Sequence, residues 1–291
     1  MVIVQLIGGL GNQMFQYAMA KRLAVLKDTL LKFDITLFKN YGDRQYDLGC
    51  FNIKENFASQ EEICRLRGPY NKKIPWKTFK LINRAKPVHM RSYFKEKQFN
   101  FDPEVFKVSG DVYVEGYWQS EKYFKDIKHT IREDLQFKTE PDPANKEMAD
   151  LILNLNSVSV HIRRGDYVSD PEVKKVHGTC SMDYYNNAVE NMLEKIKNPH
   201  FFVFSDDPAW VLKNLKINHP ITFINKNSGK AFEDLRLISY CRHHIIANSS
   251  FSWWGAWLSK NPHKIVIAPK KWFNDPCINT EDLVPESWNK L

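Results

Sequence analysis

The sequence reads Ser157-Val-Ser-Val-His-Ile-Arg-Arg-Gly-Asp-Tyr167, an apolar run that ends in charged residues. A second such run, Phe201-Phe-Val-Phe-Ser-Asp-Asp-Pro208, follows one helix-like stretch later. Short apolar runs that alternate with helical patterns predict parallel strands joined by right-handed crossovers. We therefore predict an α/β domain whose sheet is covered on both faces. The predicted strands are 157–162, 201–205, 221–224, 244–247 and 264–268, and the predicted helices are 182–196, 208–215, 232–241 and 252–258.

The first half of the chain opens in the same way. A strand at 2–6 leads through a glycine-rich turn into a helix at 12–27 and a strand at 29–33, and a further alternating run covers 111–116. Thr139-Glu-Pro-Asp-Pro-Ala144 carries two prolines without apolar periodicity and is predicted to be a linker. The 291 residues are enough for two domains, which we predict at 1–140 and 145–291.

Composition excludes several classes of protein. With 43% hydrophobic and 26% charged residues the chain is an ordinary globular protein and not a disordered one. It lacks a stretch of about 18 consecutive apolar residues, and its N-terminus lacks the basic region of a secretory signal, so a cytoplasmic location is expected. Five scattered cysteines without a C-x-x-C pair argue against a zinc knuckle and a disulfide framework.

The net charge of +8 is concentrated in one segment, because residues 65–97 carry a net +10 and the rest of the chain −2. Lys73, Lys77, Lys80 and Arg84 recur there at helical spacing, and Trp76, Phe79 and Ile82 share a different face. Pro75 is placed to start this helix and Pro87 to stop it. Two interpretations stay open: a solvated surface helix, or a helix that docks residues 73–84 on anionic lipid of the inner membrane.

The turn Gly8-Gly-Leu-Gly-Asn-Gln13 joins the first strand to the first helix. Its glycines let the backbone approach a ligand, and helix-start amides attract anions. It is not a dinucleotide fingerprint, because Met14 stands where the third glycine belongs, and it is not a P-loop. This argues against an NAD-dependent oxidoreductase. A plain structural turn remains the alternative, although the polar pair Asn12 and Gln13 favours a site.

The arginine motif lies at the carboxyl end of the predicted 157–162 strand, where ligands of parallel sheets bind. Strand alternation places His161 and Arg163 on one face, and Arg164 on the other if the strand continues that far. Arginine suits phosphate because its planar fork donates two parallel hydrogen bonds. The alternative is a structural ion pair of an arginine with Asp166.

Three further segments each allow two interpretations. Asp206 and Asp207 either cap a helix or accept hydrogen bonds from a base or ribose. The run Asn248-Ser-Ser-Phe251 either caps a helix or presents amides and hydroxyls to a phosphate. The run from Glu115 to Phe124, which holds Tyr117, Trp118 and Gln119, either binds sugar rings or forms an ordinary junction. The arginines, the hydroxyls at a helix start and the acidic strand end, all at strand carboxyl ends in the second half of the chain, together describe a pocket for a nucleoside diphosphate.

These motifs, taken in order, resemble the bacterial α-1,2-fucosyltransferases of glycosyltransferase family 11. The resemblance implies an α/β fold of GT-B architecture, two Rossmann-like domains facing across a cleft, with the acceptor side in the N-terminal domain. It implies GDP-β-L-fucose as donor, a galactose-terminated oligosaccharide or lipid-linked glycan as acceptor, and inversion to an α-1,2 linkage. It implies neither a metal nor another cofactor. The segments that carry it are 8–18, 116–124, 161–167, 204–207 and 248–254.

The resemblance also implies roles for individual residues. Arg163, Asp166 and Asn12 are the expected catalytic residues, with Asp166 either the base or a group that orients an arginine. Gln13, Tyr117, Trp118 and Gln119 are expected at the acceptor. Nucleic acid is not an expected partner, although a protein that senses a nucleotide or binds nucleic acid without turnover stays the alternative. The expected donor-binding residues are Gly9, Gly11, His161, Arg163, Arg164, Asp206, Asp207, Asn248, Ser249, Ser250 and Phe251.

Overall fold

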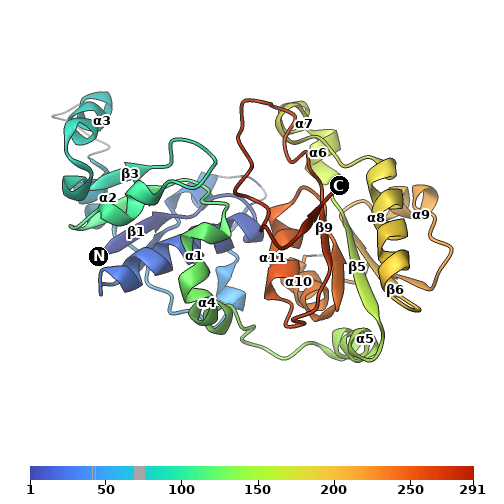
Figure 1. Ribbon diagram of the computed structural model, residues 1–291. Coiled ribbons are helices and arrows are strands. Elements are labelled where there is room, and N and C mark those ends of the chain that lie inside the picture. The colour runs from blue at the N-terminus through green and yellow to red at the C-terminus, as the bar shows by residue number, and fades with distance from the viewer. Residues whose placement is uncertain (41, 43, 69–75, 228) are drawn as a thin grey trace. The chain divides into compact units, whose positions relative to one another are not determined.

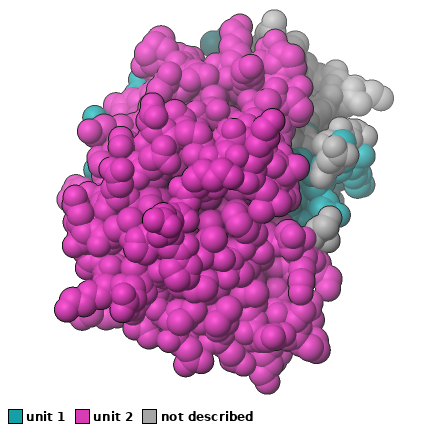
Figure 2. All heavy atoms as spheres, turned by 90° about the vertical axis from the view of Figure 1, so that its right-hand side faces the viewer, with its two compact units in different colours: residues 1–138, 281–283 teal, residues 139–280, 284–291 magenta. Residues whose placement is uncertain are grey.

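The computed structural model describes residues 1–40, 42, 44–68, 76–227 and 229–291 and divides into two compact units. Unit 1 comprises Met1–Lys138 and Glu281–Leu283, and unit 2 comprises Thr139–Thr280 and Val284–Leu291 (Figures 1 and 2). Residues 281–283, which the sequence prediction placed in the C-terminal domain, therefore pack with the N-terminal unit.

Unit 1 is built on a four-stranded parallel sheet of order β2-β1-β4-β3. On one face, Ile3, Tyr93 and Tyr113 of the strands pack against Ile63 and Leu66. The helix after β1 begins two residues earlier than predicted, with Gly9 as its N-cap. The elements are β1 (Val2–Gln5), α1 (Leu10–Leu26), β2 (Leu31–Asp34), α2 (Gln60–Arg67), α3 (Trp76–Ala85), β3 (Tyr93–Lys95), β4 (Val112–Glu115) and α4 (Lys128–Asp134).

Unit 2 is built on a six-stranded sheet of order β10-β9-β8-β5-β6-β7, in which every recorded strand pair is parallel. The central strand β5 matches its predicted range and is buried along its whole length. The strands are β5 (Ser157–Ile162), β6 (His200–Ser205), β7 (Ile221–Ile224), β8 (His243–Ile245), β9 (Val266–Ala268) and β10 (Asn289–Lys290). The helices are α5 (Pro143–Asn154), α6 (Gly165–Ser169), α7 (Pro171–His177), α8 (Met182–Lys195), α9 (Pro208–Asn214), α10 (Ala231–Tyr240) and α11 (Ser250–Leu258).

Strand β6 shows how this sheet is covered on both faces. Phe201 and Val203 belong to a core cluster that includes residues of α8 and α9. Phe202 and Phe204 belong to a second cluster with residues of α5 and α10. Successive side chains of a strand point to opposite faces, so an uninterrupted apolar run is what a sheet with two buried faces requires. The predicted α/β layering is confirmed (Figure 1).

The predicted linker at 139–144 is wrong at its C-terminal end, because α5 begins at Pro143. Asp142 caps this helix: its carboxylate accepts a hydrogen bond from the backbone N–H of Asn145 at 3.0 Å. Proline at the first helical position is favourable, since its missing N–H would be unpaired there in any case. The two prolines that suggested a linker include one that starts a helix.

The basic segment does form a helix, α3, but its faces differ from the prediction. Asn83 is buried, and its side-chain amide donates to the Tyr93 carbonyl at 2.6 Å. Phe79 packs against the core cluster that contains Tyr93 and Tyr113. Ile82, predicted to share the face of Phe79, is 50% exposed, and Leu81 is 67% exposed. The ammonium of Lys80 lies over the Tyr93 ring at 5.9 Å, so Lys80 faces the body of unit 1. Lys73 and Pro75 lie outside the described residues.

The described part of the chain contains helices of at most moderate length, the longest being α1. Within those residues, the helices include none with the length and apolarity needed to traverse a bilayer.

Candidate functional site

The carboxyl ends of three neighbouring strands of unit 2 carry the polar motifs of the sequence. Arg163 and Arg164 follow β5, Asp206 and Asp207 follow β6, and Asn248 lies three residues after β8. Because β5 lies between β6 and β8, parallel pairing brings these ends to one edge of the sheet. The structure therefore brings together the donor-side residues predicted in this half of the chain.

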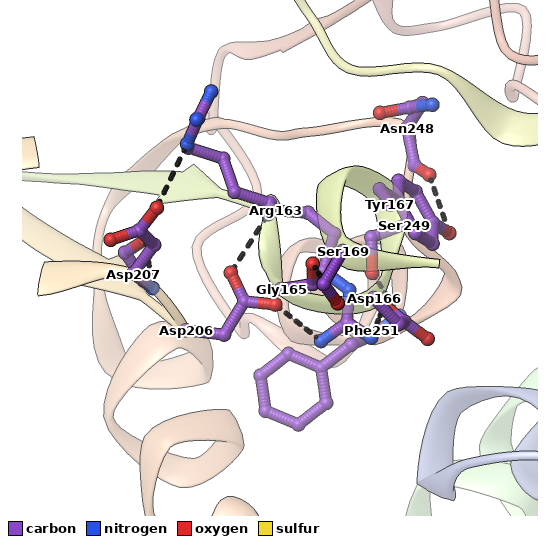
Figure 3. A network of polar contacts seen from close by, with 12 residues as sticks. Arg163, Gly165, Asp166, Tyr167, Ser169, Asp206, Asp207, Asn248, Ser249 and Phe251 are labelled. Atoms are coloured by element: carbon purple, nitrogen blue, oxygen red, sulfur yellow. Dashed lines mark hydrogen bonds and ion pairs between the residues drawn. The ribbon is translucent and has the colours of Figure 1, made fainter. Parts of the chain in front are cut away.

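Arg163 is held by two carboxylates from different elements. Its Nη2 lies 2.5 Å from Asp166 Oδ1, and its Nη1 lies 2.7 Å from Asp206 Oδ2 (Figure 3). The guanidinium also lies over the Tyr167 ring at 5.2 Å. The ion pair with Asp166 that the sequence left open is thus present, and it fixes the orientation of the planar fork.

The side chain of Arg164 has different partners, although β5 ends at Ile162 and strand alternation therefore does not extend to it. Its Nε lies 3.0 Å from Asp207 Oδ2, and its guanidinium stacks 3.8 Å above the Trp210 ring. Asp207 also caps α9, since it accepts a hydrogen bond from the Trp210 N–H at 3.2 Å. The capping interpretation of the acidic pair is therefore confirmed for Asp207.

Asp206 connects β6 to the turn after β5. Besides Arg163, it accepts a hydrogen bond from the backbone N–H of Arg164 at 2.8 Å. An ideal Cβ on Gly165 would stand 2.5 Å from Asp206 Oδ2, so only glycine permits this approach. Asp206 forms its ion pair with Arg163, whereas Asp207 forms its ion pair with Arg164. The described residues contain no group of three His, Cys, Asp or Glu side chains that could hold a metal ion.

His161 lies beneath the arginine motif, buried next to Phe251 with ring centroids 5.6 Å apart. Burial lowers its pKa to about 4; the charge of Asp206 opposes this shift and that of Arg163 adds to it. Its Nδ1 is buried without a hydrogen-bond partner in the described structure. The ring is therefore neutral at pH 7.

The segment after β8 combines a structural and a candidate binding role. The Asn248 side-chain amide donates to the carbonyls of His177, Gly178 and Trp272, so it holds two loops in place. Ser249 is the N-cap of α11: its hydroxyl accepts from the Phe251 N–H at 3.3 Å. The helix thus begins at Ser250, two residues before the prediction, and its first amides belong to the residues proposed to bind phosphate.

Tyr167 joins this helix start to the arginine motif. Its ring lies against Arg163, and its hydroxyl donates to the Asn248 carbonyl at 3.4 Å (Figure 3). Arginine, neutral histidine and helix-start amides thus lie at one edge of the sheet, and these are groups that suit an anion.

Unit 1 brings the predicted Asn12 and Gln119 into contact. Gln119 Nε2 donates to Asn12 Oδ1 at 2.8 Å, and Asn12 packs over Gly8, whose φ is +75°. Gln13 is fully buried; its amide binds the carbonyls of Gly8 and Gln45 and the N–H of Asp47. The side-chain amide of Gln13 is therefore occupied by contacts with the protein backbone.

The other predicted acceptor residues differ in exposure. Trp118 is completely buried with φ +59°, whereas Tyr117 is 37% exposed. Gly9 caps α1 and Gly11 lies in its first turn. Of the four predicted acceptor residues, Tyr117 is the one with an exposed side chain.

Two residues that the sequence did not single out contact this part of unit 1. Arg44 Nη1 lies 3.2 Å from the position of a Cβ on Gly9. Glu96 accepts hydrogen bonds from the N–H groups of Tyr117 at 2.7 Å and Trp118 at 3.0 Å. Burial raises the pKa of Glu96 to about 7 against the opposing effect of those two hydrogen bonds. Its position as the single acid in residues 65–97 was the signal available in the sequence.

Comparison with known proteins agrees with the site. The family model described as Glycosyl transferase family 11 matches residues 1–291. An alpha-1,2-colitosyltransferase of Escherichia coli is 38% identical across 100% of this chain and 98% of its own length. The O-antigen biosynthesis glycosyltransferase WbnK of the same species is 32% identical across 98% of each. The galactoside alpha-(1,2)-fucosyltransferase 2 of Pongo pygmaeus is 24% identical across 88% of this chain and 68% of its own length.

The fold is shared with a solved structure. The crystal structure of fucosyltransferase NodZ from Bradyrhizobium superposes with a TM-score of 0.52 at 12% identity, covering 91% of this chain and 94% of that one. The predicted α/β fold of the GT-B class is confirmed by this likeness.

Proposed function

The chain belongs to glycosyltransferase family 11, and from this premise we propose that it transfers L-fucose from GDP-β-L-fucose, with inversion, to the 2-hydroxyl of a terminal β-galactoside. At the coarser level it is an α-1,2-glycosyltransferase. The acceptor galactoside stands on an oligosaccharide or a lipid-linked glycan.

The observation that carries this proposal is the setting of Arg163. Two carboxylates fix its guanidinium at the carboxyl end of the central strand, and Tyr167 links it to the start of α11. As the bond from fucose to GDP breaks, negative charge grows on the β-phosphate. Donors fixed in advance stabilise that charge without the cost of reorganisation. Arg163, with the amides and hydroxyls of Ser249 and Ser250, would supply those donors.

Metal independence follows from the same reasoning. Transferases that use a divalent cation rely on it to stabilise the departing diphosphate. Here a guanidinium and helix-start amides would serve instead. We expect full activity in EDTA; strict dependence on added Mn²⁺ or Mg²⁺ would contradict this part of the proposal.

The attacking hydroxyl must lose a proton, and Asp166 is the candidate base. Its ion pair with Arg163 supports a second role, in which it orients the guanidinium. Asp166→Asn separates the two: loss of a base lowers kcat with unchanged affinity for GDP, whereas loss of an orienting partner weakens GDP binding as well.

The donor sugar is the finer part of the proposal. The colitosyl relative raises colitose, the 3-deoxy counterpart of fucose, as the competing donor. The fucosyl relative and the motif resemblance favour fucose. A site that hydrogen-bonds the 3-hydroxyl would reject the sugar that lacks it.

Incubation with lactose and either GDP-fucose or GDP-colitose tests the proposal, with the product linkage determined by NMR. We expect an α-1,2-fucosylated galactose. Exclusive use of GDP-colitose would correct the donor, and GDP binding without turnover of either sugar would favour a nucleotide sensor.

A further inference from the structure

A pocket of about 830 Å³ lies in unit 1 between α3 and β3, and its lining includes none of the predicted catalytic, donor-binding or acceptor-binding residues. Its lining includes five basic side chains and one carboxylate, that of Glu96. The basic residues are Lys80, Arg84, Arg91, Lys95 and Lys97. The volume is within the range of ligand pockets, roughly 300–1,000 Å³.

Much of this positive charge is not neutralised locally. Lys95 lies 2.6 Å from Glu115, but Glu115 also lies 3.5 Å from Arg67 and accepts the Tyr93 hydroxyl proton in a hydrogen bond. Glu96 directs both carboxylate oxygens at backbone N–H groups. Glu115 and Glu96 thus share their oxygens among several donors, while the pocket lining carries five cations.

Arg91 is fixed without a carboxylate. Its Nε donates to the Lys86 carbonyl at 3.1 Å and its Nη2 to the Arg84 carbonyl at 3.0 Å, so it closes the end of α3. Among the described residues, Arg84, Arg91 and Lys97 form no ion pair at 4.0 Å or less. The nearby Glu104, whose pKa the charges of Lys97 and Arg91 help to lower, pairs with Lys107.

The wall next to these cations is apolar. Leu81, at 67% exposed, lines the pocket, and Phe94 and Tyr93 contribute buried rings. A cavity with guanidinium and ammonium groups and an apolar wall suits a phosphate joined to an apolar or sugar group.

We propose that this pocket binds a phosphate or diphosphate group. Glu96 connects it to the Tyr117–Trp118 backbone, so a phosphate carried by the glycan acceptor is the favoured source; that part rests on the proposed function. A bilayer headgroup and free diphosphate share the same chemistry.

Binding is tested first, on the full chain saturated with GDP so that the unit 2 site is occupied. Calorimetry with inorganic pyrophosphate compares the wild type with the double variant Arg84→Glu, Lys97→Glu. We expect affinity to fall about tenfold or more, as lost charge-assisted hydrogen bonds require. The control is Lys54→Glu, Lys128→Glu, which makes the same charge change on exposed side chains of unit 1. Equal affinities in all three proteins would overturn the proposal, as would an equal loss in the control.

The source is then distinguished by two further measurements. If the acceptor carries the group, the double variant raises KM for a galactoside with an alkyl diphosphate at its reducing end and leaves KM for the neutral galactoside unchanged. If a bilayer carries it, the double variant loses binding to phosphatidylglycerol vesicles, with phosphatidylcholine vesicles as the blank. Absence of transfer to both acceptors would refute the proposed function, while the pyrophosphate titration would still decide the pocket.

Discussion

Arg163 has the sharpest individual consequence, because two carboxylates hold it where the leaving phosphate is proposed to lie. We predict that Arg163→Ala lowers kcat by about 10²–10³, the cost of removing one fixed donor to a developing oxyanion. The fold should persist, since the side chain is 22% exposed and touches the edge of the sheet. Steady-state kinetics with circular dichroism checks both statements.

Lys213→Ala is a suitable comparison, because this exposed cation lies in the last turn of α9 without a recorded ion pair. Wild-type turnover by Arg163→Ala, with normal folding, would remove Arg163 from the mechanism.

His161 predicts a pH dependence of stability. Its folded pKa, about 4, is below the unfolded value of 6.5, so the unfolded chain binds more protons between these limits. The contribution of His161 to the free energy of unfolding is complete above pH 6.5 and is lost as the pH falls toward 4. The total loss is on the order of 3 kcal/mol. Urea unfolding at pH 7 and pH 5 should show a smaller loss for His161→Gln than for the wild type. Equal losses in the two proteins would exclude this origin.

At the scale of single residues, strand alternation did not reach the arginine motif, because β5 ends at Ile162; the turn after the strand gives Arg163 and Arg164 their different side-chain partners. Local sequence patterns could not predict that the Gln13 side chain is buried and binds three backbone groups, because two of those groups belong to residues more than thirty positions away. Pairing between distant segments has no local periodicity, and Glu96 was missed for the same reason.

Among the elements, the strands of unit 2 were predictable, because an uninterrupted apolar run is what a parallel strand buried on both faces requires. The faces of α3 were not. Its apolar and basic residues lie on different sides, yet Leu81 and Ile82 are exposed, and the buried Asn83, which bonds the β3 backbone, lies on the side that packs. A polar anchor that satisfies a neighbouring strand cannot be distinguished by type from a solvated asparagine.

The segment after β4 depends on Glu96 for its conformation. Trp118 has φ +59°, an uncommon value for a large side chain. The backbone N–H groups of Tyr117 and Trp118 both donate to the Glu96 carboxylate. In Glu96→Gln one of those N–H groups would face an NH₂ donor. We predict a rise in KM for the acceptor of about tenfold with unchanged GDP affinity.

Glu104→Gln provides the matched control, since this exposed carboxylate pairs with Lys107 and does not contact the segment. A change in GDP affinity equal to the change in KM would show that Glu96 does not act on the acceptor side alone.

For the whole molecule, the prediction of two α/β domains held at the level of fold, but the path of the chain was not predictable. Residues 281–283 return to unit 1, and the following residues, 284–291, complete unit 2. A three-residue excursion carries no composition shift and no periodicity. What marks it is a set of tertiary hydrogen bonds at Asp282.

Asp282 therefore tests how unit 1 is stabilised. Its carboxylate accepts from the Phe101 N–H at 3.0 Å and pairs with Lys122 at 2.5 Å, and its carbonyl accepts from Ser120. Asp282→Ala removes the acceptor of the Phe101 N–H and the carboxylate that pairs with Lys122, so we predict a loss of about 1–3 kcal/mol of stability. Hydrogen exchange should show the loss in β1 and β4 while β5 and β6 keep their protection. Glu286→Ala, an exposed carboxylate four residues later, should leave both sheets unchanged. If protection fell equally in both sheets, the units would unfold as one, and the loss could not be assigned to the Asp282 contacts with unit 1.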